Sequence, residues 1–200
     1  MFTWEAGATP TNSPVGGDFF GVGLVSSFGP PFDFLDPNDP TKEYTFYIYN
    51  LDSQGSVSFG PPAQQFYVTN YNGGNFDLYE GTPRNSDWVP NPPNASVPST
   101  FIDGTLLLSG NFTSFQTQTN NFTAFQVGNL EGNLNFTGGS LYDLTFRGGQ
   151  PCPGLFTGGI TWKTSVLIPG YIFRHDGKLD LNCPVPAQQS SWGKIKAQYH

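Results

Sequence analysis

The chain carries little charge. Acidic and basic residues together make up 12% of the 200 residues, whereas about a quarter is usual in soluble domains. The 15 acids outnumber the 8 bases, which gives a net charge of −7, and the bases form no run. Phosphate backbones and anionic membranes attract basic surfaces. The composition therefore argues against nucleic acid as a partner.

Long apolar runs are also missing. No stretch of 18 apolar residues occurs, so we predict no transmembrane segment. The segment from Met1 to Pro14 has neither a charged leader nor an apolar core. We expect that a leader was removed and that the protein is extracellular or on the cell surface, with the periplasm as the alternative.

Cysteine and histidine are scarce. Cys152 and Cys183 are the only cysteines, both beside proline, and His175 is the only histidine away from the C-terminal residue. This set is too small for a structural zinc site. We predict a disulfide, worth roughly 3 to 4 kcal/mol in the chain-entropy model if the compartment is oxidising. Two unpaired buried thiols are the alternative.

Aromatic rings and chain breakers dominate what is present. The chain has 19 Phe, 9 Tyr and 4 Trp beside 25 Gly and 18 Pro. Gly and Pro interrupt long helices, while aromatic residues favour strands. We predict an all-β fold with a core of rings: one antiparallel, jelly-roll-like β-sandwich domain over residues 1–200. A short β-helix is the alternative, and residues 190–200 are predicted to form a short terminal helix or docking tail.

Alternation and turn chemistry predict individual elements. Tyr44 to Leu51 is the clearest strand, with apolar residues on both faces. Asn72-Gly73-Gly74-Asn75 and Asp176-Gly177 have the residue types of tight hairpins, which would put His175 at the mouth of a turn. The five prolines between Pro83 and Pro98 predict a long irregular connection.

The remaining predicted strands follow at the spacing expected of an all-β domain. These are Phe19 to Val25, Gln65 to Tyr71, Phe76 to Glu80, Thr105 to Gly110, Phe112 to Thr117, Phe122 to Val127, Gly132 to Thr137, Leu141 to Arg147, Leu155 to Trp162, Val166 to Arg174 and Lys178 to Leu181.

Four asparagines lie in glycosylation sequons. In a eukaryotic secretory pathway they would mark exposed, glycosylated positions. In a bacterial protein they would reflect only the frequency of Asn and Thr in turns and strands. The four are Asn94, Asn111, Asn121 and Asn135.

An acidic loop precedes the clearest strand. Asp33, Asp36, Asn38 and Asp39 lie close together, and closely spaced oxygen ligands suit Ca²⁺. Asp and Asn before proline are also ordinary turn formers. Calcium is therefore one hypothesis for this loop, and a simple turn is the other. We expect no other cofactor.

Aromatic residues around the first predicted hairpin and in the proline-rich segment are candidate ligand contacts. Tyr67, Tyr71, Tyr79 and Trp88 would stack on sugar rings if they faced solvent. The alternative is that the rings pack inward, as most rings do.

No catalytic motif occurs. The chain has no Gly-x-Ser-x-Gly elbow, no His-Glu-x-x-His and no phosphate-binding glycine loop, so we expect a protein that is not an enzyme. A carbohydrate-active hydrolase needs only two facing carboxylates and stays a third hypothesis.

The sequence favours a structural or assembly domain that associates with itself, or with extracellular matrix or glycans. Uncharged strand edges can pair with neighbouring chains, and lysines that would prevent this are few. A carbohydrate-binding module, assisted by calcium, is the alternative.

The assembly hypothesis predicts that the purified protein forms dimers or fibres through strand edges or termini. Size-exclusion chromatography with light scattering measures this directly. A purely monomeric profile at high concentration would contradict it.

Overall fold

The computed structural model describes residues 1–89, 98–122 and 126–183. Nearly all regular structure in them is β. The strands are β1 (Phe2–Glu5), β2 (Asp18–Leu24), β3 (Glu43–Phe59), β4 (Phe66–Gly81), β5 (Thr105–Asn120), β6 (Val127–Gly138), β7 (Phe146–Arg147), β8 (Gln150–Pro151), β9 (Gly154–Thr161) and β10 (Phe173–Leu181). A one-turn helix α2 (Ser99–Ile102) and a 3₁₀ turn η1 (Tyr142–Thr145) complete the described elements.

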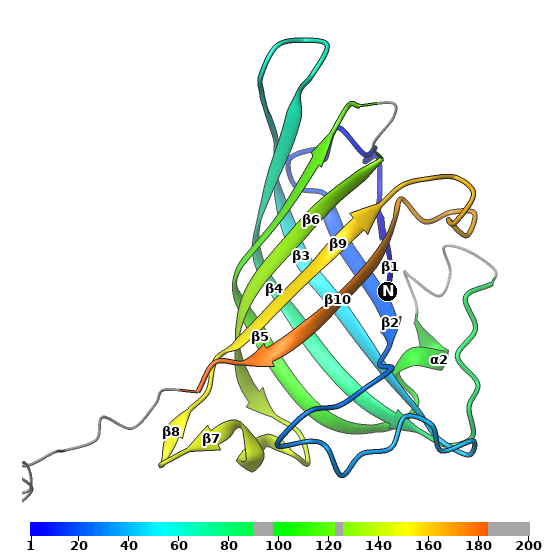
Figure 1. Cartoon of the computed structure of the whole chain (residues 1–200), viewed down its shortest axis with the longest axis vertical. Helices are drawn as coiled ribbons and strands as arrows, with labels where there is room; N and C mark the ends of the chain where they lie inside the picture. The colour runs from blue at the N-terminus through cyan, green and yellow to red at the C-terminus, as the bar shows by residue number, and fades with distance from the viewer. Residues whose placement is uncertain (90–97, 123–125, 184–200) are drawn as a thin grey trace, which may run out of the picture.

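Eight strands close into one barrel. The order around it is β1-β10-β9-β6-β5-β4-β3-β2, every pairing is antiparallel, and β7 and β8 form a separate small sheet (Figure 1). The predicted all-β, antiparallel class is confirmed. The expected sandwich is replaced by a barrel because β1 pairs with both β2 and β10 and so joins the first strand to the last.

Connections alternate between the two ends of the barrel. The turns β1–β2, β3–β4, β5–β6 and β9–β10 lie at what we call the hairpin end, where the β3–β4 hairpin projects beyond the others (Figure 1). The other three connections and Cys183 lie at what we call the disulfide end. No helix in the described residues is long and apolar enough to cross a membrane.

The hairpin predicted at Asn72-Gly73-Gly74-Asn75 is wrong. These residues lie inside β4, and the turn between β3 and β4 falls at residues 60–65. Gly73 and Gly74 do have positive φ angles, of 67° and 97°. They occur where the β3–β4 register runs from Tyr49–Asn75 to Leu51–Gly73. Glycine here lets a long strand bend around the barrel instead of reversing it.

The hairpin predicted at Asp176-Gly177 is also wrong, because both residues lie in the middle of β10. Gly177 is paired with Gly158 on β9, and a Cβ at Gly177 would lie 2.3 Å from the Thr157 carbonyl oxygen. A glycine in a strand can mark a close backbone approach as well as a turn. As a result, His175 is a buried residue of the barrel wall and is not at a turn.

The predicted core of rings is confirmed inside the barrel. Rings on the inner wall lie over glycines of neighbouring strands: a Cβ at Gly132 would come within 2.7 Å of the Phe115 ring, and one at Gly23 within 2.2 Å of Phe46. The fully or nearly fully buried rings and aliphatics include Phe19, Phe76, Phe112, Phe115, Phe156, Ile48, Leu51, Leu108, Leu130 and Leu134.

A second apolar cluster covers the outer face of the barrel. Phe101 of α2 is fully buried there together with Val22 and Tyr171. Trp88, from the proline-rich connection between β4 and β5, packs on Phe101 with ring centroids 4.7 Å apart. The connection is irregular from residue 82 to 89, as predicted, and residues 90–97 lie outside the described part.

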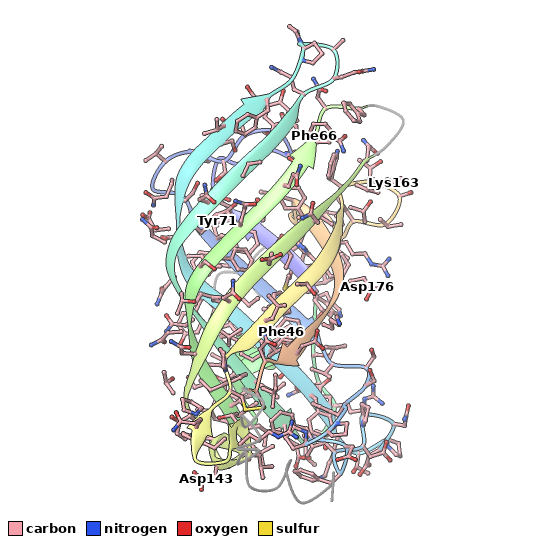
Figure 2. All side chains as sticks on the ribbon, turned by 60° about the vertical axis from the view of Figure 1, so that its left-hand side comes forward. Phe46, Phe66, Tyr71, Asp143, Lys163 and Asp176 are labelled. Carbon is pink, nitrogen blue, oxygen red and sulfur yellow. A yellow bond between two sulfur atoms is a disulfide. The ribbon has the colours of Figure 1, made fainter. Side chains whose placement is uncertain are left out.

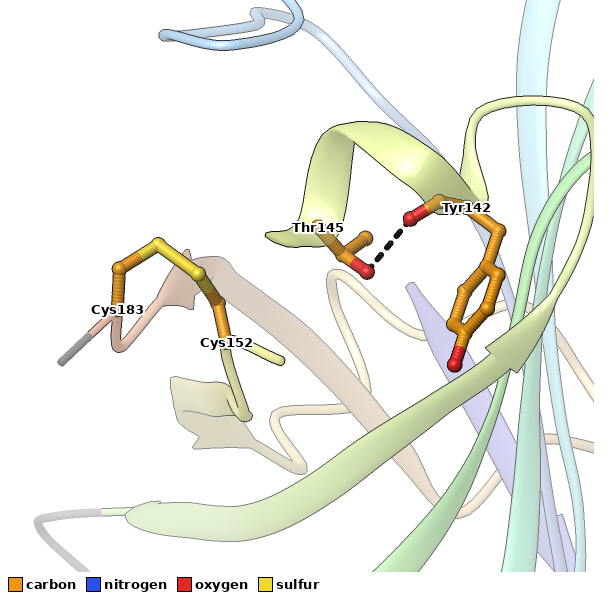
Figure 3. Close-up of a disulfide and its surroundings, with 4 residues drawn as sticks. All are labelled: Tyr142, Thr145, Cys152 and Cys183. Carbon is orange, nitrogen blue, oxygen red and sulfur yellow. Dashed lines mark hydrogen bonds between the residues drawn. A yellow bond between two sulfur atoms is a disulfide. The ribbon is translucent and has the colours of Figure 1, made fainter. Parts of the chain in front are cut away.

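Cys152 and Cys183 form the predicted disulfide, with Cα atoms 4.2 Å apart (Figure 3). The Cys152 N–H donates to the Thr145 carbonyl at 2.7 Å, which ties the end of η1 to the bridge. Disulfides are typical of oxidising compartments, so the bridge is compatible with the expected extracellular location. The tail predicted at 190–200 lies outside the described residues.

Replacing both cysteines with serine should lower the free energy of unfolding by roughly 3 to 4 kcal/mol, because the bridge closes a separation of 31 residues. Guanidinium unfolding of the oxidised wild type and the double variant measures the difference. Reductant should shift the wild-type midpoint and leave that of the variant unchanged. Equal midpoints without reductant would contradict the prediction.

Candidate functional site

The barrel encloses a cavity of about 340 Å³ toward its disulfide end. Apolar side chains from β3, β4, β5, β6 and β9 form its wall, and they include four rings. An eight-stranded barrel is just wide enough either to be filled by its own side chains or to hold one small ligand. The wall residues are Phe46, Phe76, Leu78, Leu108, Leu130, Phe136 and Phe156.

Two paired glycines account for the empty space. Gly158 on β9 faces Leu130 of β6 on one side and Gly177 of β10 on the other, and both glycines line the cavity. The atoms nearest to a Cβ at either position are backbone atoms, so no neighbouring side chain lies over these two glycines. Two adjacent wall positions therefore contribute no side chain to the interior.

The cavity reaches the surface between β10 and the β2–β3 connection. Exposed residues of both segments line it there, namely Ser26, Ser27, Lys178 and Asp180. Lys178 and Asp180 form a surface ion pair with 2.7 Å between Nζ and Oδ2. Phe28 and Phe32 also line this part, so the mouth has apolar walls and a polar rim.

His175 is the polar side chain that lines the buried part of the cavity. It is 4% exposed, and its Nε2 lies 2.8 Å from the hydroxyl of Thr3 on β1. Its Nδ1 is buried and has no hydrogen-bond partner in the protein. Burial holds the pKa of His175 well below its usual value, because charging the ring away from water is unfavourable, so the ring is neutral at physiological pH.

The opposite end of the barrel is closed by a satisfied polar cluster. Glu5 is 3% exposed and accepts hydrogen bonds from the hydroxyls of Ser13 and, at 3.1 Å, Tyr71. Ser13 also bonds Ser53 at 2.5 Å. Burial raises the pKa of Glu5. The space left in this cluster is about 10 Å³, too little for a ligand, so the cluster closes the barrel.

The four predicted ligand-binding aromatics do not form one surface. Tyr71 is 4% exposed inside the barrel, nearer the hairpin end than Phe46 (Figure 2). Trp88 belongs to the outer cluster beside Phe101. Tyr67 is half-buried and bonds Gln65, and Tyr79 is half-buried and bonds Asp77. These tyrosines and the tryptophan come from different faces.

A row of outward-facing rings was not foreseen. Trp4, Phe20, Tyr47 and Tyr49 follow one another across β1, β2 and β3 with nearly parallel planes, the last pair 4.6 Å apart. The centroids of Trp4 and Phe20 are 5.7 Å apart and those of Phe20 and Tyr47 are 6.4 Å apart, so the rings form one continuous row on the outer wall. Tyr49 also donates to Asp77, at 3.0 Å.

The acidic loop lies in the β2–β3 connection. Asp36 Oδ1 accepts from the Asn38 N–H, and Asp39 Oδ1 accepts from the N–H and hydroxyl of Thr41. These are turn-forming contacts, and they hold the pKa of Asp39 below its usual value. Asp33 is exposed. In the described residues no three acidic, histidine or cysteine side chains gather into a metal site, and calcium stays a prediction from sequence alone.

The sequons fall on different elements. Asn111 and Asn135 are exposed and face each other across β5 and β6. Asn121 follows β5, where its side chain bonds Pro62 and Gln65. Asn94 lies outside the described residues. Glycosylation stays a prediction.

Acidic residues do not face each other across the cavity. Its acidic lining residues are Asp176 and Asp180, both exposed and both on β10. A hydrolase would need two carboxylates on opposite sides of a bound sugar, and this cavity does not offer them.

The sequence analysis did not identify the cavity residues, although their alternation along two strands is a signal for them. Every second residue from Gly154 to Ile160 and from Phe173 to Leu181 faces inward. Strict alternation would have placed Gly158, His175 and Gly177 on one inner face. The turn preference of Asp176-Gly177 conflicts with that alternation and favours a hairpin instead.

Comparison with known proteins gives no relative: no family model, curated protein or solved structure matches the chain.

The neutral, buried His175 should make the fold sensitive to mild acid. Between its usual pKa near 6.5 and its lowered folded pKa, the unfolded chain binds a proton that the folded protein does not. Stability is therefore lost as pH falls below about 6.5. Glu5, whose pKa is raised, acts in the opposite sense at its own titration.

Comparing wild type with His175→Phe isolates the histidine, because Glu5 is present in both. The wild type should lose up to about 1.4 kcal/mol more per pH unit than the variant as pH falls through this window. Urea unfolding at pH 7.5, 6.5, 6.0 and 5.5 measures the slopes. Parallel slopes would show that His175 does not titrate in this way.

Proposed function

We propose that this protein binds a small, largely apolar molecule inside its barrel and is not an enzyme. The observation that carries the proposal is the cavity of about 340 Å³, walled by rings and leucines and open at one end. Protein cores are normally packed as tightly as organic crystals, and voids larger than a water are few. A cavity of this size is well beyond a packing defect.

The size and lining set the class of ligand. Ligand pockets commonly measure about 300–1,000 Å³ and are mainly apolar with a few polar groups. A cavity of about 150 Å³ lined by Leu, Ile and Phe is enough for benzene. The space here therefore suits a molecule of roughly two fused rings, or an aliphatic chain of similar volume.

The barrel also bears on the assembly hypothesis. Each of the eight barrel strands pairs on both sides, so most strand edges that would recruit a second copy are occupied. At the N-terminal end β1 is already paired on both sides, and residues 184–200 at the other end lie outside the described part. Self-association and carbohydrate binding stay predictions without a structural observation that favours them over cavity binding.

Binding can be tested with N-phenyl-1-naphthylamine, an uncharged dye whose emission rises in apolar surroundings. Wild-type protein should bind it saturably with one site per chain. Leu130→Phe should weaken binding at least tenfold, because Leu130 lines the cavity and is paired with Gly158 on the neighbouring strand, so a larger ring there would extend into the space beside the glycine.

Leu106→Phe is the matched control, because Leu106 is 37% exposed and does not line the cavity. It should bind the dye as wild type does. Thermal unfolding should show that Leu130→Phe is folded, and no less stable if the ring occupies the void. Unchanged dye binding by folded Leu130→Phe would place the dye elsewhere and remove the support for this function.

A further inference from the structure

His175 carries a hydrogen-bonding atom that the protein itself does not use. Its Nε2 is turned to Thr3, which does not line the cavity, while Nδ1 is buried without a partner. Buried polar groups are nearly always paired, because an unpaired one has lost its hydrogen bonds to water without replacement. His175 lines the cavity and Tyr171, whose hydroxyl is also buried and unpaired, does not, so a hydrogen-bonding group in the cavity could pair only with His175.

The position of His175 defines the inner end of the cavity. Along β10 the inward residues that line it run from His175 through Gly177 and Leu179 to Leu181, which lies near the disulfide end. The His175 ring contacts Phe19 and Phe173, with centroids 6.4 Å and 5.9 Å away. Phe173 also lines the small space beside Glu5, so its ring lies between His175 and the polar cluster. A group bound to Nδ1 would therefore lie deepest in the cavity.

The charges around the cavity favour an uncharged group at that end. The charged side chains that line it are Asp176, Lys178 and Asp180, all exposed at the rim. The Met1 amino group donates to the His175 carbonyl, and burial lowers its pKa to about 6, so it is mostly uncharged at neutral pH. Burying an unpaired ion at the inner end would be costly.

Resting on the proposed function, we infer that His175 Nδ1 anchors the ligand, and that the ligand is an apolar molecule with one uncharged hydrogen-bonding group, such as a hydroxyl or carbonyl, held at the inner end. Nδ1 donates or accepts a hydrogen bond according to the tautomer that the Thr3 hydroxyl selects at Nε2. A ligand hydroxyl can pair with either tautomer, because it can both donate and accept. The apolar body then extends along Leu179 toward the mouth.

The experiment compares two ligands that differ by one hydroxyl, naphthalene and 2-naphthol, on wild type and on His175→Phe. Displacement of N-phenyl-1-naphthylamine at pH 7.5 gives the four dissociation constants. Because the ratio of the two ligands' constants is compared between proteins, their different affinities for water cancel. The ratio should move about 3- to 10-fold against 2-naphthol in the variant, as expected for loss of one hydrogen bond.

Two further variants keep the result interpretable. Tyr171→Phe removes the hydroxyl that, in the described part of the chain, is also buried without a partner; it lies in the outer cluster, so the ratio should stay unchanged. His175→Phe leaves the Thr3 hydroxyl buried without a partner, which could destabilise the single variant. The double variant Thr3→Val/His175→Phe removes both partners of this hydrogen bond and avoids that cost. It should show the same change in ratio.

The outcomes separate the two proposals. If both ligands bind both proteins and the ratio of their dissociation constants is the same in wild type and His175→Phe, the role of His175 is overturned and cavity binding is left intact. Failure of both ligands to bind wild type would overturn the cavity function and this inference with it. Tighter binding of 2-naphthoate than of 2-naphthol would overturn the assignment of an uncharged group.

Discussion

The pairing of β1 with strands on both of its sides is the contact on which the rest of the structure depends. Phe2 and Thr3 pair with Val22 and Gly21 of β2 and with Arg174 and Phe173 of β10. These few residues convert an eight-stranded sheet with two free edges into a barrel. Closure fixes the width of the interior. The volume of the interior is then fixed, so an inward position with a small residue leaves space that no other side chain fills.

The interior is divided into two parts of opposite character. Phe19 contacts Tyr71 and Phe115, with ring centroids 5.1 Å and 5.4 Å apart, and this ring layer crosses the barrel. On its hairpin side, Glu5 and its hydroxyl partners close the end. On its disulfide side, the glycine pair Gly158–Gly177 leaves the cavity. One end is thus sealed by hydrogen bonds, and the other is open because side chains are missing.

Much of the local structure follows from the sequence, but the closure does not. Strands at Phe19 and at Tyr44 to Leu51, the ring core and the Cys152–Cys183 bridge could be predicted because alternation, composition and cysteine count are local or global properties of the chain. A sandwich and a barrel share these properties. They differ in whether β1 reaches β10, a pairing that joins residues more than 170 positions apart.

The cavity could not be predicted from sequence because glycine is compatible both with a tight turn and with a close backbone approach inside a strand. Asp176-Gly177 has the residues of a tight turn, yet Gly177 allows β9 and β10 to approach closely. The same ambiguity affected Gly73 and Gly74 in β4. A residue preference describes which backbone conformations are allowed, whereas the neighbouring strand decides which one is used. A turn at Asp176-Gly177 would place His175 at its mouth, whereas the observed strand places it in the buried wall of the cavity.

Glu5 and His175 differ in how their hydrogen-bonding atoms are satisfied, and this difference underlies the proposal that His175 contacts a ligand. Both are buried in the barrel, and each is a departure from an apolar core that must be compensated. Glu5 accepts hydrogen bonds at both carboxyl oxygens, so a ligand could add nothing there. His175 has one nitrogen bonded and one bare, and it borders space that a molecule can enter. Nδ1 of His175 is therefore the buried polar atom to which a hydrogen-bonding group inside the cavity could add a contact.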